Sequence, residues 1–424
     1  MFRPSLRPSV AREGVGRNLS LDLVAAIGVG VTAALVSALL PTIARRTGIE
    51  PIGLAALASA PFIANLLGMF AGRVGPRSAF RLAVVRGAGA ASLIVLVAFP
   101  SPLVMVAVTI VYWSSLSLGA PFHLRLWGAM YPSRLRGRVV GFLGMGRAAA
   151  GALAVLAGGI VADRLGGETA VAAAGLVGLV AAIGFAGLRA PAADAPPAFS
   201  ARGSIRALRE RPTLSRVALA QGFYGGGLIA AAPLYAMVNV DRLDLTMADV
   251  GVLGLLSAAG TTIAFLAWGA ATDRRGALPV MRIGSLLGLS AIVAYAVAPG
   301  LPFLWYAALV GGISWAAIEV GIAAVVSDQT TLADRAAAMA GWNALTGARG
   351  IVAAFSMSLL IQLGIVDVTV GILLCAVASA IGVVLFFRAR PGIPVETRAW
   401  EIQTHPAQAP TSTPVTTSAS SAPA

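Results

Sequence analysis

The sequence predicts an all-α integral membrane protein in which twelve transmembrane helices form two parallel, pseudo-symmetric six-helix bundles. Three observations support this fold class. Only 11% of the 424 residues are charged and 58% are hydrophobic, whereas about 25% of the residues of a soluble domain are charged. Apolar segments long enough to cross a bilayer as helices recur along the chain. Residue patterns also repeat at a separation close to half the chain length.

The apolar segments define the individual membrane spans. Barrel strands would alternate polar and apolar residues, and the sequence lacks that alternation, so helices must satisfy the backbone hydrogen bonds within lipid. The twelve spans are expected at residues 19–44, 51–72, 79–99, 102–130, 139–162, 169–188, 214–239, 248–271, 279–298, 302–326, 336–363 and 366–387.

The spans divide the chain into two six-helix halves, 19–188 and 214–387, with three further segments. Residues 1–18 form an N-terminal tail, and residues 388–424, rich in Pro, Ser, Thr and Ala, form a C-terminal tail that we expect to be disordered. Residues 189–213 link the halves. In this linker Ile205 and Leu208 can rest on the membrane surface with arginines toward the headgroups. A solvated connection is the alternative that we favour.

The distribution of arginine predicts the orientation in the membrane. With the N-terminus inside, the inner segments hold 23 arginines and the outer loops hold 4. Because basic residues are retained on the cytoplasmic side, both termini are expected in the cytoplasm and the protein in the plasma (inner) membrane. The net charge of +14 then reflects topology and contact with membrane lipids. It does not indicate nucleic-acid binding, since the sequence offers no basic soluble domain.

The composition offers little for catalysis. Cys375 is the single cysteine, so no disulfide or cysteine-based metal site can form within the chain, and His123 and His405 lie far apart. No nucleophile–base set or metal cluster is evident in the sequence. The chain has no lysine and therefore no lysine-containing phosphate loop. We predict that the protein is not an enzyme and that it requires neither a cofactor nor a metal.

An internal repeat relates the two halves. Four residues after the second span recur 201 residues later, after the eighth: Gly68, Arg73, Gly75 and Arg81 match Gly269, Arg274, Gly276 and Arg282. Three more recur at 202 residues: Trp113, Gly119 and Arg147 match Trp315, Gly321 and Arg349. Agreement among separate segments makes coincidence an inadequate explanation. Because each half has six spans, both halves enter the membrane from the same side, as parallel repeats do.

These features resemble the major facilitator superfamily. The resemblance covers about residues 18–390 and rests on the twelve spans, the cytoplasmic middle loop and the loop motif Gly-x-x-x-Asp-Arg-x-Gly. The segment Tyr131-Pro132 with Arg136-Gly137-Arg138 also looks like that family. The motif residues in the two loops are Gly68, Arg73, Gly75, Gly269, Asp273, Arg274 and Gly276.

The resemblance also implies roles for particular residues. In the family, the acidic residue of the loop motif helps to latch the cytoplasmic gate, and Asp273 fits that role. The first copy departs from the pattern, because Gly72 stands where the family usually has Asp. The fifth span, with Gly151, Gly158 and Gly159, lacks the Gly-Pro pair that marks antiporters, which weakens an interpretation as a drug–proton antiporter.

Ionisable residues inside the spans are the candidates for binding and coupling. A charge at membrane depth costs at least about 2.5–3.5 kcal/mol. Glu319 in the tenth span and Arg349 in the eleventh differ in depth by about 9 Å at a rise of 1.5 Å per residue, so the two side chains can nearly meet. Such a pair either serves a substrate or proton site or locks two helices together. The sequence leaves both interpretations open.

Further polar residues accompany them. Arg147 lies at a depth where Asp22 could approach it, and it is expected to bind an anionic group or to snorkel to the inner surface. Arg86 is expected to snorkel. Ser117 aligns with Glu319 across the repeat, which places both on matching faces, and Gln221 is a polar candidate for the same central cavity or for an interhelical hydrogen bond.

We therefore predict a secondary active transporter that moves a small molecule by alternating access. Glu319 is the first candidate for proton coupling and Asp22 the second. The embedded arginines favour an anionic or polar metabolite, whereas the apolar remainder favours efflux of amphipathic compounds. A uniporter is possible if Glu319 is structural, and a non-transporting sensor or assembly protein is the alternative from a different class. A monomer is expected.

Overall fold

The computed structural model describes residues 8–189 and 201–390. Helices make up the fold, and the described residues contain no strand. Twelve helical segments are long and apolar enough to cross a membrane, which confirms the predicted fold class of a multi-pass membrane protein. The fourth, Pro102–Met130, has the predicted bounds, and the others differ from prediction by four residues or fewer at either end. The predicted C-terminal tail lies largely outside the described residues.

The N-terminal half contains eight helices, of which seven form its six spans. Its first span, Val15–Arg46, joins α1 and α2, and α4 is a single turn in the loop after α3. The helices are α1 (Pro8–Ala38), α2 (Leu40–Arg46), α3 (Pro51–Gly68), α4 (Ala71–Val74), α5 (Ala79–Ala98), α6 (Pro102–Met130), α7 (Ser133–Leu165) and α8 (Gly167–Ala186). Because α1 begins at Pro8, part of the predicted tail is helical.

The C-terminal half repeats this order after the linker helix α9. The elements are α9 (Ala201–Arg209), α10 (Pro212–Met237), a π-helical turn η1 (Val238–Arg242), α11 (Met247–Arg275), α12 (Ala277–Val297), α13 (Leu301–Gln329), α14 (Leu332–Gln362) and α15 (Val368–Arg388). Local signals explain several starts. Proline occupies the first turn of α3, α6, α10 and α13, where its missing N–H costs nothing. Ser78 and Ser101 accept hydrogen bonds from the first turns of α5 and α6.

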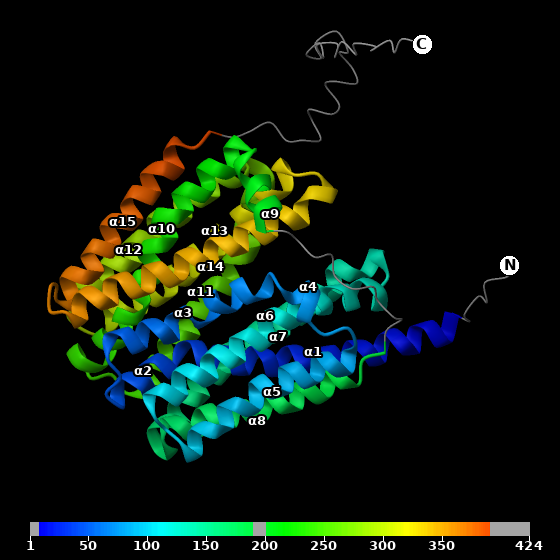
Figure 1. Cartoon of the computed structure of the whole chain (residues 1–424), viewed down its shortest axis with the longest axis horizontal. Helices are drawn as coiled ribbons and strands as arrows, with labels where there is room; N and C mark the ends of the chain where they lie inside the picture. Colours follow the sequence, from blue (N-terminus) through cyan, green and yellow to red (C-terminus); the bar gives the residue numbers. More distant parts are fainter. Residues whose placement is uncertain (1–7, 190–200, 391–424) are drawn as a thin grey trace, which may run out of the picture.

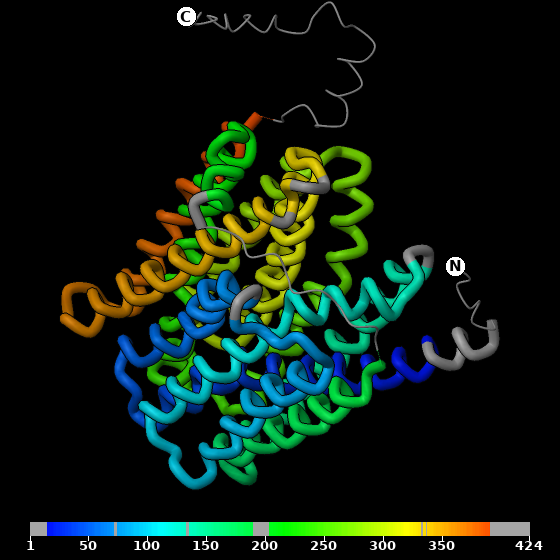
Figure 2. Tube along the Cα trace, turned by 45° about the vertical axis from the view of Figure 1, so that its right-hand side comes forward, coloured from blue at the N-terminus to red at the C-terminus, as the bar shows by residue number. Residues whose placement is uncertain are grey.

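The two halves lie side by side and meet along two helix pairs. In Figure 1 the N-terminal half is blue to green and the C-terminal half green to orange, and Figure 2 shows the same division after rotation. The pairs that join the halves are α3 with α14 and α7 with α11. Within the N-terminal half α1 packs mainly on α7 and α8, and α6 packs on α3 and α5. Because each of them packs mainly on other helices, α1 and α6 share few contacts.

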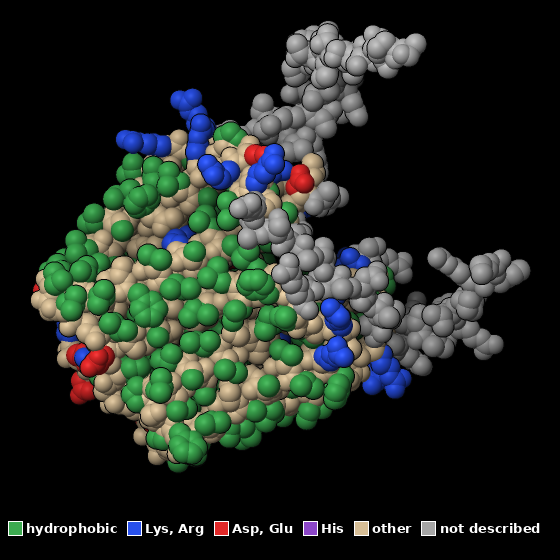
Figure 3. Space-filling model, in the orientation of Figure 1, with side chains coloured by type: hydrophobic (Ala, Val, Ile, Leu, Met, Phe, Trp, Pro, Cys, Tyr) green, Lys and Arg blue, Asp and Glu red, His purple; other side chains and the backbone are tan. Residues whose placement is uncertain are grey.

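The surface of the molecule is divided by polarity. Figure 3 shows a broad apolar face, with charged side chains gathered at its edges. Large apolar side chains such as Leu103, Leu266 and Ile183 are exposed. A belt of this kind suits contact with acyl chains.

The linker helix α9 is packed against the protein. Leu208 is buried in an apolar cluster that also contains Trp342 of α14, and Arg211 forms an ion pair of 2.7 Å with Asp334. Ile205, by contrast, is exposed. The less favoured alternative, in which Leu208 rests on the membrane surface, is therefore wrong, because α14 covers Leu208.

Candidate functional site

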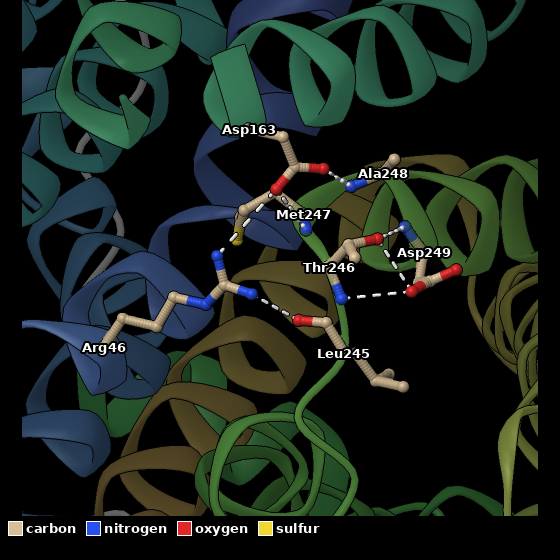
Figure 4. A network of polar contacts seen from close by, with 7 residues as sticks. All are labelled: Arg46, Asp163, Leu245, Thr246, Met247, Ala248 and Asp249. Atoms are coloured by element: carbon tan, nitrogen blue, oxygen red, sulfur yellow. Dashed lines mark hydrogen bonds and ion pairs between the residues drawn. The ribbon is translucent and has the colours of Figure 1, made fainter. Parts of the chain in front are cut away.

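One end of the molecule holds a polar network between the two halves (Figure 4). Asp163, at the end of α7, accepts hydrogen bonds of 2.8 Å from the backbone N–H groups of Met247 and Ala248 at the start of α11. Arg46 lies 3.9 Å from the Asp163 carboxylate and donates to the Leu245 carbonyl. A helix start leaves N–H groups unpaired and carries positive potential. A carboxylate of one half thus caps a helix of the other.

A second set of bonds joins the halves at the same end. Gln362, the last residue of α14, accepts a hydrogen bond of 3.1 Å from the backbone N–H of Ile52 at the start of α3. Its amide also donates to Glu50 at 2.7 Å. In addition, Arg45 forms an ion pair of 2.7 Å with Asp241. The two caps are related by the repeat, since the end of α7 meets α11 as the end of α14 meets α3.

These contacts show at which end the halves are closed. Among the described residues, every hydrogen bond and ion pair that joins the halves lies at the end that carries α2 and η1. The loop motif lies at the opposite end, where Asp273 and Arg274 are exposed and Asp273 bonds no described residue. The predicted latch at Asp273 is therefore not engaged in this conformation.

The other loop-motif residues have mainly local roles. Gly276 adopts φ +80° between α11 and α12, a left-handed backbone conformation that favours glycine. Gly68 faces Ser117, and a Cβ added at Gly68 would lie 3.6 Å from the Ser117 Cβ. Ser117 is thus half-buried against α3. Gly75 ends α4 and Gly269 has open space around it, whereas the side chain of Arg73 lies outside the described residues.

Asp22 is the most completely paired acid inside the N-terminal half. Its side chain is fully buried and accepts from His123 Nε2 at 2.9 Å, Trp127 Nε1 at 2.6 Å and the Tyr131 hydroxyl at 3.1 Å. The three partners are spaced by four residues on α6 and its end, so they lie along one face. Burial and the neighbouring Asp22 raise the pKa of Tyr131, which keeps this phenol protonated as a donor.

This cluster corrects one interpretation made from sequence. Asp22 pairs with His123, and not with Arg147, so His123 belongs to the same site. Trp127 and Tyr131 were missed as partners, although their spacing of four residues from His123 was visible in the sequence. The sequence does not show that Asp22 of α1 lies against this face of α6.

The repeat identified two embedded arginines, and the side chain of each packs against a glycine of a neighbouring helix. A Cβ at Gly30 would lie 2.9 Å from the Arg147 Cγ, and a Cβ at Gly225 would lie 3.1 Å from the Arg349 Cζ. Arg147 is exposed. Arg349 donates to the Gln221 carbonyl, while its own Nε and the Gln221 side-chain oxygen are buried without partners.

Glu319 and Arg349 do not form an ion pair. Glu319 is exposed and no hydrogen bond or ion pair to a described residue holds it, whereas Arg349 is engaged by α10. Ala317 and Gly321 pack against α12. At about 100° per residue, Glu319 lies on the opposite side of α13 from this contact, and the exposed Trp315 precedes it by one turn.

Comparison with known proteins identifies the fold. A family model described as Major Facilitator Superfamily matches residues 217–417. This match agrees with the duplicated helical architecture described above. The matched region covers just under half of the chain, within its C-terminal part.

Solved structures extend the superfamily likeness to both halves. The nucleoside transporter NupG has a TM-score of 0.69 at 14% sequence identity, covering 88% of this chain and 98% of that chain. The POT family transporter PepTSo has a TM-score of 0.67 at 11% identity, covering 92% and 99%. A bacterial homolog of the human lysosomal transporter Spinster, in an inward-facing and occupied conformation, has a TM-score of 0.64 at 14% identity, covering 91% and 97%. At these identities the likeness shows a shared fold alone. No curated protein matches the chain.

Proposed function

We propose that this protein is a secondary active transporter that moves a small molecule across the plasma membrane by alternating access, with both termini in the cytoplasm. The observation that carries the proposal is the polar closure between the halves at a single end. Hydrogen bonds and ion pairs can exchange for bonds with water when the halves rock apart. The match of residues 217–417 to the superfamily model and the fold shared with solved transporters support the same mechanism.

The distribution of arginine supports the assignment of sides. The closed end carries the loops that hold 4 arginines, and the opposite end carries the segments that hold 23. By the positive-inside rule, the closed end faces outward. The structure is then an outward-closed state, and its substrate site opens toward the cytoplasm.

Unpaired charges support a polar or anionic substrate. Glu319 projects from α13 away from the peripheral helix α12, and Arg147 is exposed within its span. Charges at membrane depth are costly unless they are paired or face a watery cavity. We infer that both groups, together with Gln221 and Ser117, line the path between the halves. An amphipathic substrate is supported only by the apolar remainder of the spans.

Proton coupling is proposed at Glu319, with Asp22 as the second candidate. Glu319 suits the role better because no described side chain bonds it, so its proton can exchange with the cavity. Asp22 holds three hydrogen bonds, and a change in its protonation would alter the contact between α1 and α6.

The coupling prediction concerns Glu319→Gln. In proteoliposomes with a pH difference of one unit, symport or antiport of one proton can sustain about a tenfold solute gradient, or about 1.4 kcal/mol. We expect the wild type to accumulate a ligand found by thermal-stabilisation screening, and Glu319→Gln to equilibrate it without accumulation. Asp244→Asn, an exposed acid at the outward loop, serves as the matched control. Accumulation by Glu319→Gln equal to that of the wild type would refute the assignment.

A further inference from the structure

Arg86 is a buried cation without a counter-ion. The side chain leaves α5 within the third span, is only 8% exposed, and lies over the Phe185 ring at 5.5 Å. A Cβ at Gly119 would lie 2.9 Å from its Nε. No described residue accepts a hydrogen bond from this guanidinium, and the Nε atom is buried. Snorkelling to the inner surface, as predicted from sequence, is therefore wrong, because α6 and α8 enclose the group.

A second unpartnered donor lies near it. Tyr112 of α6 is 2% exposed, and its hydroxyl is buried without a hydrogen bond. The Tyr112 hydroxyl interacts electrostatically with Arg86 and with Arg147, and the two arginines interact with each other. Arg147 reaches this region from α7 across Gly30 of α1. Side chains from three helices thus present positive charge and donor groups to one region between α1 and α6.

The nearest buried acid does not neutralise these groups. Asp22 is committed to His123, Trp127 and Tyr131, and no ion pair joins it to Arg86 or Arg147 among the described residues. An uncompensated charge in a dry interior is strongly unfavourable. A guanidinium and a phenol are complemented by an acceptor that carries negative charge.

We propose that Arg86, Tyr112 and Arg147 form a binding site for a compact anionic group, of the size of a carboxylate or a halide, inside the N-terminal bundle. Anion binding at this site depends on neither transport nor proton coupling. The anionic group can belong to the transported substrate or to a free inorganic ion. The exposed Arg147 marks the side from which the anion enters, between α1 and α6, which share few contacts.

Thermal unfolding of the purified full-length protein tests this site. Sodium formate and sodium chloride are titrated separately at constant ionic strength, with sodium gluconate as the balancing salt because its anion is much larger than formate or chloride. We expect a saturable rise in Tm with at least one of the two small anions, since a ligand that binds only the folded state stabilises it. Tighter binding of formate points to a carboxylate substrate, and equal or tighter binding of chloride points to an inorganic ion.

Variants assign the effect to these residues. Arg86→Gln is expected to abolish the saturable rise in Tm. Tyr112→Phe removes one oxygen atom and is expected to raise the anion concentration at half-saturation about tenfold, as one hydrogen bond to a charged group is lost. This conservative change keeps the test valid if Arg86→Gln fails to fold. Tyr306→Phe is the matched control, because its hydroxyl lies on α13 beside Ser290.

Two results would overturn the proposal. The first is a wild-type Tm that shows no saturable response to formate or chloride. The second is a response that Tyr112→Phe and Arg147→Gln both leave unchanged. Neither result bears on transport itself, which is measured separately through Glu319, so failure of the anion site and failure of the transporter proposal are distinguishable.

Discussion

Replacing Asp22 with alanine is expected to destabilise the protein by about 3–5 kcal/mol, the cost of breaking a buried charged pair by removing one partner. The carboxylate is fully buried and accepts three hydrogen bonds from one face of α6. Without it, His123 and Trp127 keep donors in a site where water cannot replace the lost acceptor. Thermal unfolding in detergent, followed by tryptophan fluorescence, measures the effect.

Graded variants separate the contribution of the charge from that of packing. Asp22→Asn keeps one carbonyl acceptor and is expected to lose less stability than Asp22→Ala. Tyr131→Phe removes one of the three bonds, at about 1.5–3 kcal/mol for a hydrogen bond to a charged group. Asp244→Asn, at an exposed position with φ +43° that asparagine tolerates, should leave stability unchanged. An Asp22→Ala protein as stable as this control would show that the cluster does not hold α1 against α6.

The spans were predictable because lipid imposes a simple rule on sequence. A helix must be apolar over its whole crossing length, so boundaries such as Pro102–Met130 follow from composition and the proline at the start. The repeat was predictable because Arg147 and Arg349 are rare charges in apolar segments. These signals are local in sequence and do not depend on which faces of the helices meet.

The pairing of side chains was not predictable for the opposite reason. Depth along the helices made Glu319 and Arg349 plausible partners. The rotation of α13 and α14 about their own axes, however, keeps the two side chains apart. Arg349 instead donates a hydrogen bond to the Gln221 carbonyl of α10, and this contact depends on the rotation of the helices. Arg86 was assigned to the surface because its position near the inner end of α5 allows snorkelling, whereas Phe185 and Gly119 hold it inside.

Replacing Asp163 with alanine is expected to shift the protein strongly away from the conformation that is closed at the end carrying α2 and η1. The carboxylate accepts two hydrogen bonds of 2.8 Å from the start of α11, each worth about 1.5–3 kcal/mol when a charged group is involved. Even the lower value for both bonds, about 3 kcal/mol, corresponds to about a 150-fold change in the ratio of closed to open forms. Loss of the Arg46 contact adds to this change.

Distances between spin labels measure the shift. Substitution of the single Cys375 by serine provides a background in which labels are placed at Arg164→Cys and Leu363→Cys, on opposite halves at the closed end. A second pair, Arg77→Cys and Arg274→Cys, reports on the other end. In Asp163→Ala we expect the first distance to lengthen and the second to shorten, because rigid halves that part at one end approach at the other. Glu168→Ala, at the same end but without a bond to the C-terminal half, should match the parent. If Asp163→Ala also matches the parent at both ends, the polar network does not control opening, and the apolar contacts of α3 with α14 and of α7 with α11 must hold the closed state.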